Sequence, residues 1–157
     1  MKRKLIMVAV LVLLLGYWVW RSREVEVIKR QCKTFISMAD SVDGGVGLFN
    51  VNRLESLLAE SIRFHIEAVE REPFQVGKIE VISGYQWLAK KAEKADFKIA
   101  EFKAITIAGK RAEVRTVVEG ILEMPDMRMF DGSQECNFTW IKDQNGKWEL
   151  SEFVFLD

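Results

Sequence analysis

The second half of the chain, from Phe97 to Asp157, constrains the fold most, because its pattern predicts consecutive antiparallel strands. The strands are expected at residues 97–107, 111–123, 134–142 and 147–156. Asn145-Gly146 separates the last two, and Asn-Gly is a strong hairpin signal because both residues tolerate positive φ. A sheet of this kind needs a cover for its apolar face, and the first half of the chain carries helical patterns that can provide it. The sequence therefore predicts an α+β domain.

Charge and cysteine usage exclude several classes of site. Acidic and basic residues number 23 each, but Lys2, Arg3 and Lys4 precede the first apolar run, which leaves 20 basic and 23 acidic residues after residue 20. A mildly acidic domain without a basic block argues against nucleic acid as a partner. One histidine and two distant cysteines form no metal-binding set, and no Gly-rich phosphate loop follows a strand. We expect no metal and no cofactor, and we expect Cys32 and Cys136 to stay unpaired.

The N-terminal run from Leu5 to Trp20 holds sixteen residues without a charge, and only Gly16 lies outside the apolar set. At about 1.5 Å per residue the run covers roughly 24 Å, compared with about 30 Å for a hydrocarbon core. Lys4 and Arg21 can extend the usable length by snorkelling. The aromatic residues Tyr17, Trp18 and Trp20 suit a headgroup interface.

Three interpretations of this run are open: an uncleaved signal-anchor, a cleaved signal peptide, and a buried helix. The end of the run offers no small-x-small cleavage pattern, which favours the signal-anchor. We therefore expect a single-pass transmembrane segment over residues 1–23, with the N-terminus inside. The domain of residues 24–157 would then be membrane-attached and lie outside the cytoplasm.

Three helical patterns and one further strand fill the first half. Apolar residues recur at helical spacing over residues 24–42 and 78–94, and a short helix capped by Asn50 or Asn52 is expected between them. Residues 62–68 alternate strictly between apolar and polar side chains, which predicts a half-buried strand. A turn is expected around Glu70 to Pro73.

The chain's one histidine, His65, lies on the polar side of this alternating strand, between Arg63 and Glu67. Its polar side either faces solvent on the outer surface of the sheet or lines the mouth of a pocket. Packing of the apolar set against the helices favours the outer surface, because burying three ionisable side chains together is costly. If a pocket does form, its candidate residues are His65, Glu67, Tyr85 and Trp87.

The order helix, helix, strand, helix and then four long strands resembles the NTF2-like superfamily, the cystatin-like α+β cone that includes SnoaL-like proteins. The resemblance covers residues 24–157. It rests on element order, on Leu57-Leu58-Ala59-Glu60-Ser61 leading into the alternating strand, and on the hairpin at Gly146-Lys147-Trp148. It implies three helices packed on a curved antiparallel sheet, with a pocket at the wide end of the cone and dimerisation through the sheet.

Enzymes of this superfamily that isomerise ketosteroids use a carboxylate on the first strand, together with a tyrosine and a protonated acid as oxyanion donors. The first helix here has Phe35 and Ile36 where a tyrosine would be needed, and Thr116 and Gly120 occupy inward positions of the second long strand. Such enzymes gain most of their rate enhancement by stabilising the developing negative charge, and this chain lacks the donors that would do so.

We therefore expect a membrane-anchored, non-catalytic NTF2-like domain that binds a small ligand or a partner protein. Two alternatives stay open. The first is a small isomerase- or dehydratase-type enzyme with a pocket near His65. The second is a subunit of an envelope assembly that forms a homodimer through the sheet face.

Overall fold

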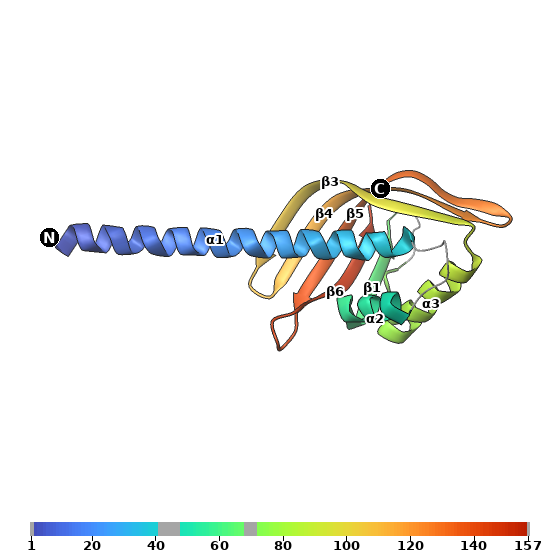
Figure 1. The fold of residues 1–157 in the computed structure, drawn as a ribbon, viewed down its shortest axis with the longest axis horizontal. Helices are drawn as coiled ribbons and strands as arrows, with labels where there is room; N and C mark the ends of the chain where they lie inside the picture. The colour runs from blue at the N-terminus through green and yellow to red at the C-terminus, as the bar shows by residue number, and fades with distance from the viewer. Residues whose placement is uncertain (1, 41–47, 68–71, 157) are drawn as a thin grey trace.

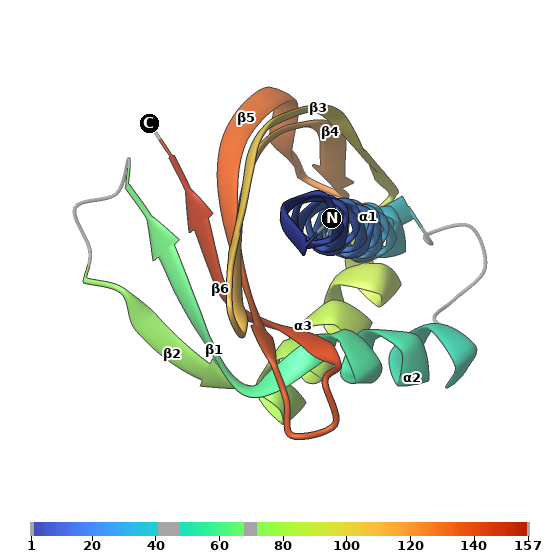
Figure 2. The same ribbon diagram turned by 90° about the vertical axis from the view of Figure 1, so that its left-hand side faces the viewer.

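The structure is a computed structural model that describes residues 2–40, 48–67 and 72–156, without the side chains of residues 2–8, 40, 48 and 49. It forms one α+β cone in which a sheet curls around a long helix (Figure 1, Figure 2). The helices are α1 (Lys2–Ser37), α2 (Leu48–Leu57) and α3 (Lys78–Lys91), with a 3-10 turn at Met38–Asp40. The strands are β1 (Leu58–Ile66), β2 (Phe74–Gly77), β3 (Lys94–Ala108), β4 (Arg111–Met124), β5 (Met127–Lys142) and β6 (Trp148–Phe155).

The six strands follow the order β2-β1-β6-β5-β4-β3. All neighbours are antiparallel except β1 and β6, which are parallel, so the sheet is mixed and not wholly antiparallel as expected. Register shifts interrupt four of the ladders, those of β1 with β6, β3 with β4, β4 with β5, and β5 with β6. Such bulges bend a strand and increase its twist, and they let the sheet wrap around α1 (Figure 2).

The predicted hairpins are present, with two differences. Strand β5 begins at Met127 and not at residue 134, and Met124 pairs with Met127, so a tight hairpin around Pro125-Asp126 joins β4 to β5. Strand β2 was not predicted, because four residues directly after Pro73 carry too little pattern. The predicted helix over residues 24–42 was expected to end at Val42, and the predicted strand over residues 62–68 at Ala68. Both ends, and the expected turn residues Glu70 and Arg71, lie outside the described residues.

The junction of α2 and β1 also differs from the prediction. Helix α2 begins at Leu48, so Asn50 and Asn52 lie inside the helix and do not cap it. Strand β1 follows directly at Leu58, before the alternating residues on which the strand prediction rested.

The prediction of a membrane-crossing N-terminal helix is wrong. In the part of the chain that the structure describes, no helix is long and apolar enough to cross a membrane. The apolar run belongs to α1, which continues through Arg21 and Arg23 into the domain as one helix. Charged residues therefore follow the run within the same helix, and the boundary expected after residue 23 falls inside α1.

The core lies between the C-terminal half of α1 and the concave face of the sheet. Ile28 and Cys32 of α1 are fully buried, and so are Phe138 and Trp140 of β5 and Leu150 of β6. The ring centroids of Phe35 and Phe138 lie 6.0 Å apart in an edge-to-face arrangement. Removal of these large side chains from water contributes most of the free energy that holds α1 in the cone.

An ion pair fixes α1 at the point where it enters the domain. Lys142, at the end of β5, pairs with Glu24, and the two side chains are only 18% and 13% exposed. The same ammonium group lies 4.7 Å from the ring centroid of Trp148 and 5.5 Å from that of Trp20. Helix α1 is thus held by a cation that is surrounded by one carboxylate and two indole rings.

Replacing Lys142 by Met is expected to lower the free energy of unfolding by about 3 kcal/mol, because it leaves the Glu24 carboxylate without its partner in a nearly buried position. Urea unfolding measures the loss. The double variant Glu24→Leu/Lys142→Met should recover most of it, since no uncompensated charge remains. Equal stability of the single and double variants would contradict this interpretation.

Gly120 of β4 allows β3 to approach closely. A Cβ at this position would lie 2.3 Å from Cδ1 of Phe97 and 2.5 Å from the carbonyl oxygen of Asp96. Gly84 of α3 offers the opposite environment, because a Cβ there would meet no atom within 4 Å outside its own helix.

Replacement by alanine is expected to change stability in opposite directions at these two glycines. Gly120→Ala should destabilise the protein by about 1–3 kcal/mol through overpacking against Phe97 and the Asp96 backbone. Gly84→Ala should stabilise it by up to about 1 kcal/mol, because alanine has the higher helix propensity. Thermal and urea melts of both variants measure the pair, and a shift of the same sign in both would refute the assignment of Gly120 as a close-approach site.

Candidate functional site

A cavity of about 390 Å³ opens inside the cone, beyond the C-terminal end of α1 and beneath α3. Eighteen residues from the helices and from the inner face of the sheet line it. They are Phe35, Ile36, Met38, Ala39, Leu54, Phe64, Val81, Gly84, Tyr85, Leu88, Phe97, Val118, Leu122, Phe130, Gln134, Cys136, Phe153 and Phe155. The volume falls in the range of small-molecule sites.

The cavity wall is almost wholly apolar. Six of the lining residues are phenylalanine, and none is Asp, Glu, Lys, Arg or His. The rings of Phe97 and Phe130 stack with centroids 5.7 Å apart, and those of Phe153 and Phe155 meet edge to face at 4.5 Å. Such a wall suits apolar or aromatic surface and penalises a charged ligand.

Tyr85 and Gln134 bring the main hydrogen-bonding groups to the wall. The hydroxyl of Tyr85 donates to the carbonyl oxygen of Met38 at 3.0 Å, which ties α3 to the end of α1. The amide nitrogen of Gln134 donates to the carbonyl oxygens of Leu156 and Glu135. Both side chains are thus oriented by backbone acceptors.

Cys136 places a thiol at the cavity wall, and Cys32 buries a second thiol in the core; both are free. Burial raises the pKa of each thiol to about 12. The thiolate is the nucleophilic form, so neither cysteine is activated for covalent chemistry.

Both thiols should resist iodoacetamide at pH 8 in the folded protein and react once urea unfolds it, as intact-mass analysis would show. The dependence of folding stability on pH gives a second measurement of the same burial. Because folding raises both pKa values above that of a free thiol, the neutral thiols stabilise the fold fully below pH 9. This contribution is lost as pH rises from about 9 towards 12. A Cys32→Val/Cys136→Val variant should lose stability less steeply over that interval, and rapid alkylation of the folded parent would contradict the burial.

The structure does not bring the four sequence-predicted site residues together. Tyr85 lines the cavity, whereas Trp87 is 57% exposed on another side of α3. Cavity-lining residues of α3 are Val81, Gly84, Tyr85 and Leu88, a stripe with spacings of three and four. Trp87 falls outside that stripe.

His65 and Glu67 lie on the outer side of the sheet. Phe64 faces the cavity and stacks on Phe74 with centroids 5.9 Å apart, so the next residue of the strand, His65, points away from the cone. This is the arrangement that the alternation favours. Nδ1 of His65 is buried and has no hydrogen-bond partner among the described residues. Glu67 lines a polar groove on the outer face together with Arg115 and Asn137.

The outer face of the sheet carries paired charges. Glu135 accepts hydrogen bonds from Lys103 and Arg115, which together lower the pKa of that carboxyl group. Glu152 lies 3.6 Å from Arg63 and 3.9 Å from Arg111. These pairs satisfy the charges within one chain. Homodimerisation through this face stays a prediction.

Sequence reasoning missed most of the cavity wall, including Gln134 and Cys136. The signal was present in the alternation of β4 and β5, because Val118, Leu122, Gln134 and Cys136 occupy inward positions of their strands. The alternation of apolar and polar residues in the strands does not reveal where α1 ends. The position of that end determines which inward residues pack against a helix and which line the cavity.

No family model and no curated protein matches this chain. Solved structures do match it over most of its length. An NTF2-like superfamily protein from Salmonella enterica aligns over 87% of this chain and 92% of its own, with 15% identity and a TM-score of 0.67. The chain has the NTF2-like fold.

Two further structures agree with this fold. An NTF2-like protein from Cytophaga hutchinsonii aligns over 83% of this chain and 94% of its own, with 20% identity and a TM-score of 0.62. An NTF2-like protein with a cystatin-like fold from Novosphingobium aromaticivorans aligns over 91% of this chain and 88% of its own, with 15% identity and a TM-score of 0.63. Identities this low establish the NTF2-like fold and leave the activity to be argued from the cavity.

Proposed function

We propose that this NTF2-like domain is a non-catalytic binding module that holds an uncharged, largely apolar small molecule in its cone. The observation that carries the proposal is the cavity of about 390 Å³, with eighteen lining residues and no ionisable Asp, Glu, Lys, Arg or His among them. Displacing water from six phenylalanine rings favours an apolar ligand, and Tyr85 and Gln134 supply a small number of polar groups that can orient it.

The chemistry of the lining supports binding over acid–base catalysis. A general base must lie within hydrogen-bond reach of the proton that it removes. His65 and Glu67 are on the far side of the sheet from the cavity, and the Cys136 thiol has a pKa raised to about 12. An isomerase-type mechanism would have to place its substrate outside the cone.

The test uses N-phenyl-1-naphthylamine, an uncharged probe whose fluorescence rises in apolar surroundings. The parent protein should bind it saturably. Gly84→Phe adds a ring to the cavity-facing stripe of α3 and should weaken binding at least about tenfold, a free-energy change of about 1.4 kcal/mol. Melting temperatures check that the variant is folded.

Two controls separate the cavity from other apolar surfaces. Gly84→Ala changes the backbone preference without filling the cavity and should keep the affinity within about twofold of the parent. Leu13→Glu, on the projecting part of α1, should also keep it. Equal binding by Gly84→Phe and Gly84→Ala, or loss of binding in Leu13→Glu, would show that the probe site is not the cone.

A further inference from the structure

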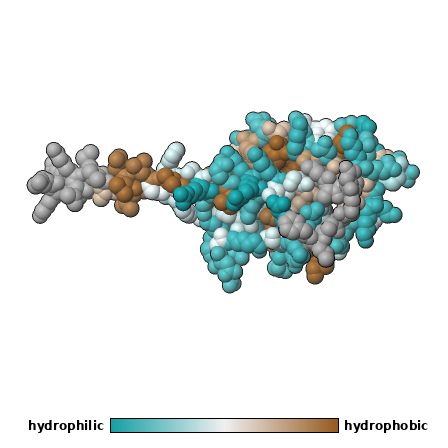
Figure 3. Space-filling model, viewed as in Figure 1, coloured by the Kyte–Doolittle hydropathy of each residue, from teal (hydrophilic) through white to brown (hydrophobic). Residues whose placement is uncertain are grey.

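The N-terminal part of α1 leaves an unusual surface exposed. Residues 9–20 project from the domain as helix, and Figure 3 shows hydrophobic side chains along them. The exposed fractions of their large apolar side chains range from 45% at Val19 to 73% at Leu13. Each of residues 9–20 is exposed, so the apolar surface surrounds the helix axis and is not confined to one stripe. A helix that is apolar on every side is stable only where something surrounds it.

This segment cannot be covered by folding back onto its own domain. Helix α1 is continuous, and its C-terminal half is held by the buried side chains of Ile28, Cys32 and Ile36. Lys142 contacts the ring of Trp20 and pairs with Glu24, so the domain begins at that level of the helix. The covering material must come from outside the domain.

A second copy of the chain covers such a segment poorly. Two helices that pair bury one stripe each and leave their opposite sides in water. The acyl layer of a lipid surface, by contrast, encloses a helix on every side.

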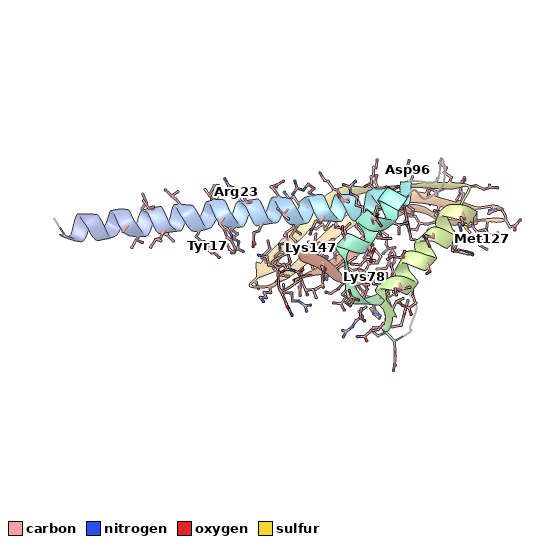
Figure 4. The ribbon with its side chains drawn as sticks, turned by 60° about the horizontal axis from the view of Figure 1, so that its bottom comes forward. Tyr17, Arg23, Lys78, Asp96, Met127 and Lys147 are labelled. Atoms are coloured by element: carbon pink, nitrogen blue, oxygen red, sulfur yellow. The ribbon has the colours of Figure 1, made fainter. Side chains whose placement is uncertain are left out.

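The residues at the base of the segment fit the boundary of such a layer. Tyr17, Trp18 and Trp20 lie next to Arg21 and Arg23, both exposed, and Figure 4 shows Tyr17 and Arg23 on the projecting helix. Aromatic rings favour the headgroup region, and the guanidinium groups complement anionic lipid phosphates. The turns that join β3 to β4 and β5 to β6 lie at the same end of the domain (Figure 1) and add Lys110 and Lys147. Asp143 lies in the second turn, and Glu149 pairs with Lys147 at 3.8 Å, so these turns add less positive charge than Arg21 and Arg23 do.

We propose that residues 9–20 embed in the apolar layer of an anionic lipid surface, with Arg21 and Arg23 at the phosphates. The attachment requires burial of the segment, not a crossing of the bilayer. It is independent of the ligand proposed for the cone.

Vesicle flotation of the full chain tests this. The probes are vesicles of phosphatidylcholine alone and of seven parts phosphatidylcholine to three parts phosphatidylglycerol. The parent should float with both and bind the anionic vesicles more tightly. Leu13→Glu/Leu14→Glu should lower the partition coefficient at least about a hundredfold. Arg21→Gln/Arg23→Gln should reduce the preference for anionic vesicles by about fivefold per residue.

The matched control is Ile79→Glu on α3, because Ile79 is 78% exposed and as apolar as Leu13 but lies on the domain. It should float like the parent. Failure of the parent to float, or flotation of Leu13→Glu/Leu14→Glu equal to the parent, would overturn the proposal. So would a lipid-free oligomer, measured by light scattering, that does not float and that Leu13→Glu/Leu14→Glu dissociates, since a second copy would then be the occupant.

Discussion

Burial of one face of α1 against the concave side of the sheet is the interaction on which the rest of the structure depends. Register shifts between its strands curve the sheet. A curved sheet is stable only if a helix covers the apolar side chains on its concave face. Ile28 and Cys32 sit opposite Phe138 and Trp140 without any exposed surface, and the Cys32 thiol lies close to the Trp140 ring. A small residue on the helix thus meets the largest residue on the sheet, which is how a tightly packed core accommodates an indole ring.

The same helix determines where the cavity lies. Side chains of α1 fill the narrow end of the cone, but the helix ends at Ser37, and its last apolar residues, Phe35 and Ile36, form part of the cavity wall. Beyond that point the inward residues Val118 and Leu122 of β4, and Gln134 and Cys136 of β5, line the cavity. The cavity is therefore the volume that a finite helix leaves unfilled in a longer sheet. One additional helical turn would occupy part of it.

The sequence predicted the strands well where alternation was long and uninterrupted, as in β4, and where Asn145-Gly146 allowed a tight turn with Gly146 at a φ of 80°. It failed at β2, which has four residues, and at the start of β5, which was expected at residue 134 because Asp131-Gly132 interrupts the strand pattern. Helix α3 was predicted over residues 78–94 and is present at Lys78–Lys91, but one residue of its apolar side was placed wrongly. Ile79 belongs to the apolar residues that recur at helical spacing over residues 78–94, yet its side chain is 78% exposed. The hydrophobic pattern of a short helix defines a stripe only loosely, and the elements that α3 packs against, α2, β1 and β2, select which side faces inward.

The fold keeps the charged network on the outer face of the sheet apart from the apolar cavity. It also keeps the cavity apart from the exposed apolar segment of α1. The ionic network of Lys103, Arg115 and Glu135 lies outside the cone, while the cavity inside it has no ionisable carboxylate or ammonium group. Helix α1 carries the exposed apolar segment at one end and part of the cavity wall at the other. Between Trp20 and Ile36 the rise of a continuous helix is about 24 Å. Because the Lys142–Glu24 pair and the core both hold this stretch, whatever covers the exposed segment stays at that distance from the cavity. Substitutions in the exposed segment should therefore leave ligand affinity in the cavity unchanged. Substitutions in the cavity wall should likewise leave the affinity of the exposed segment for its partner unchanged.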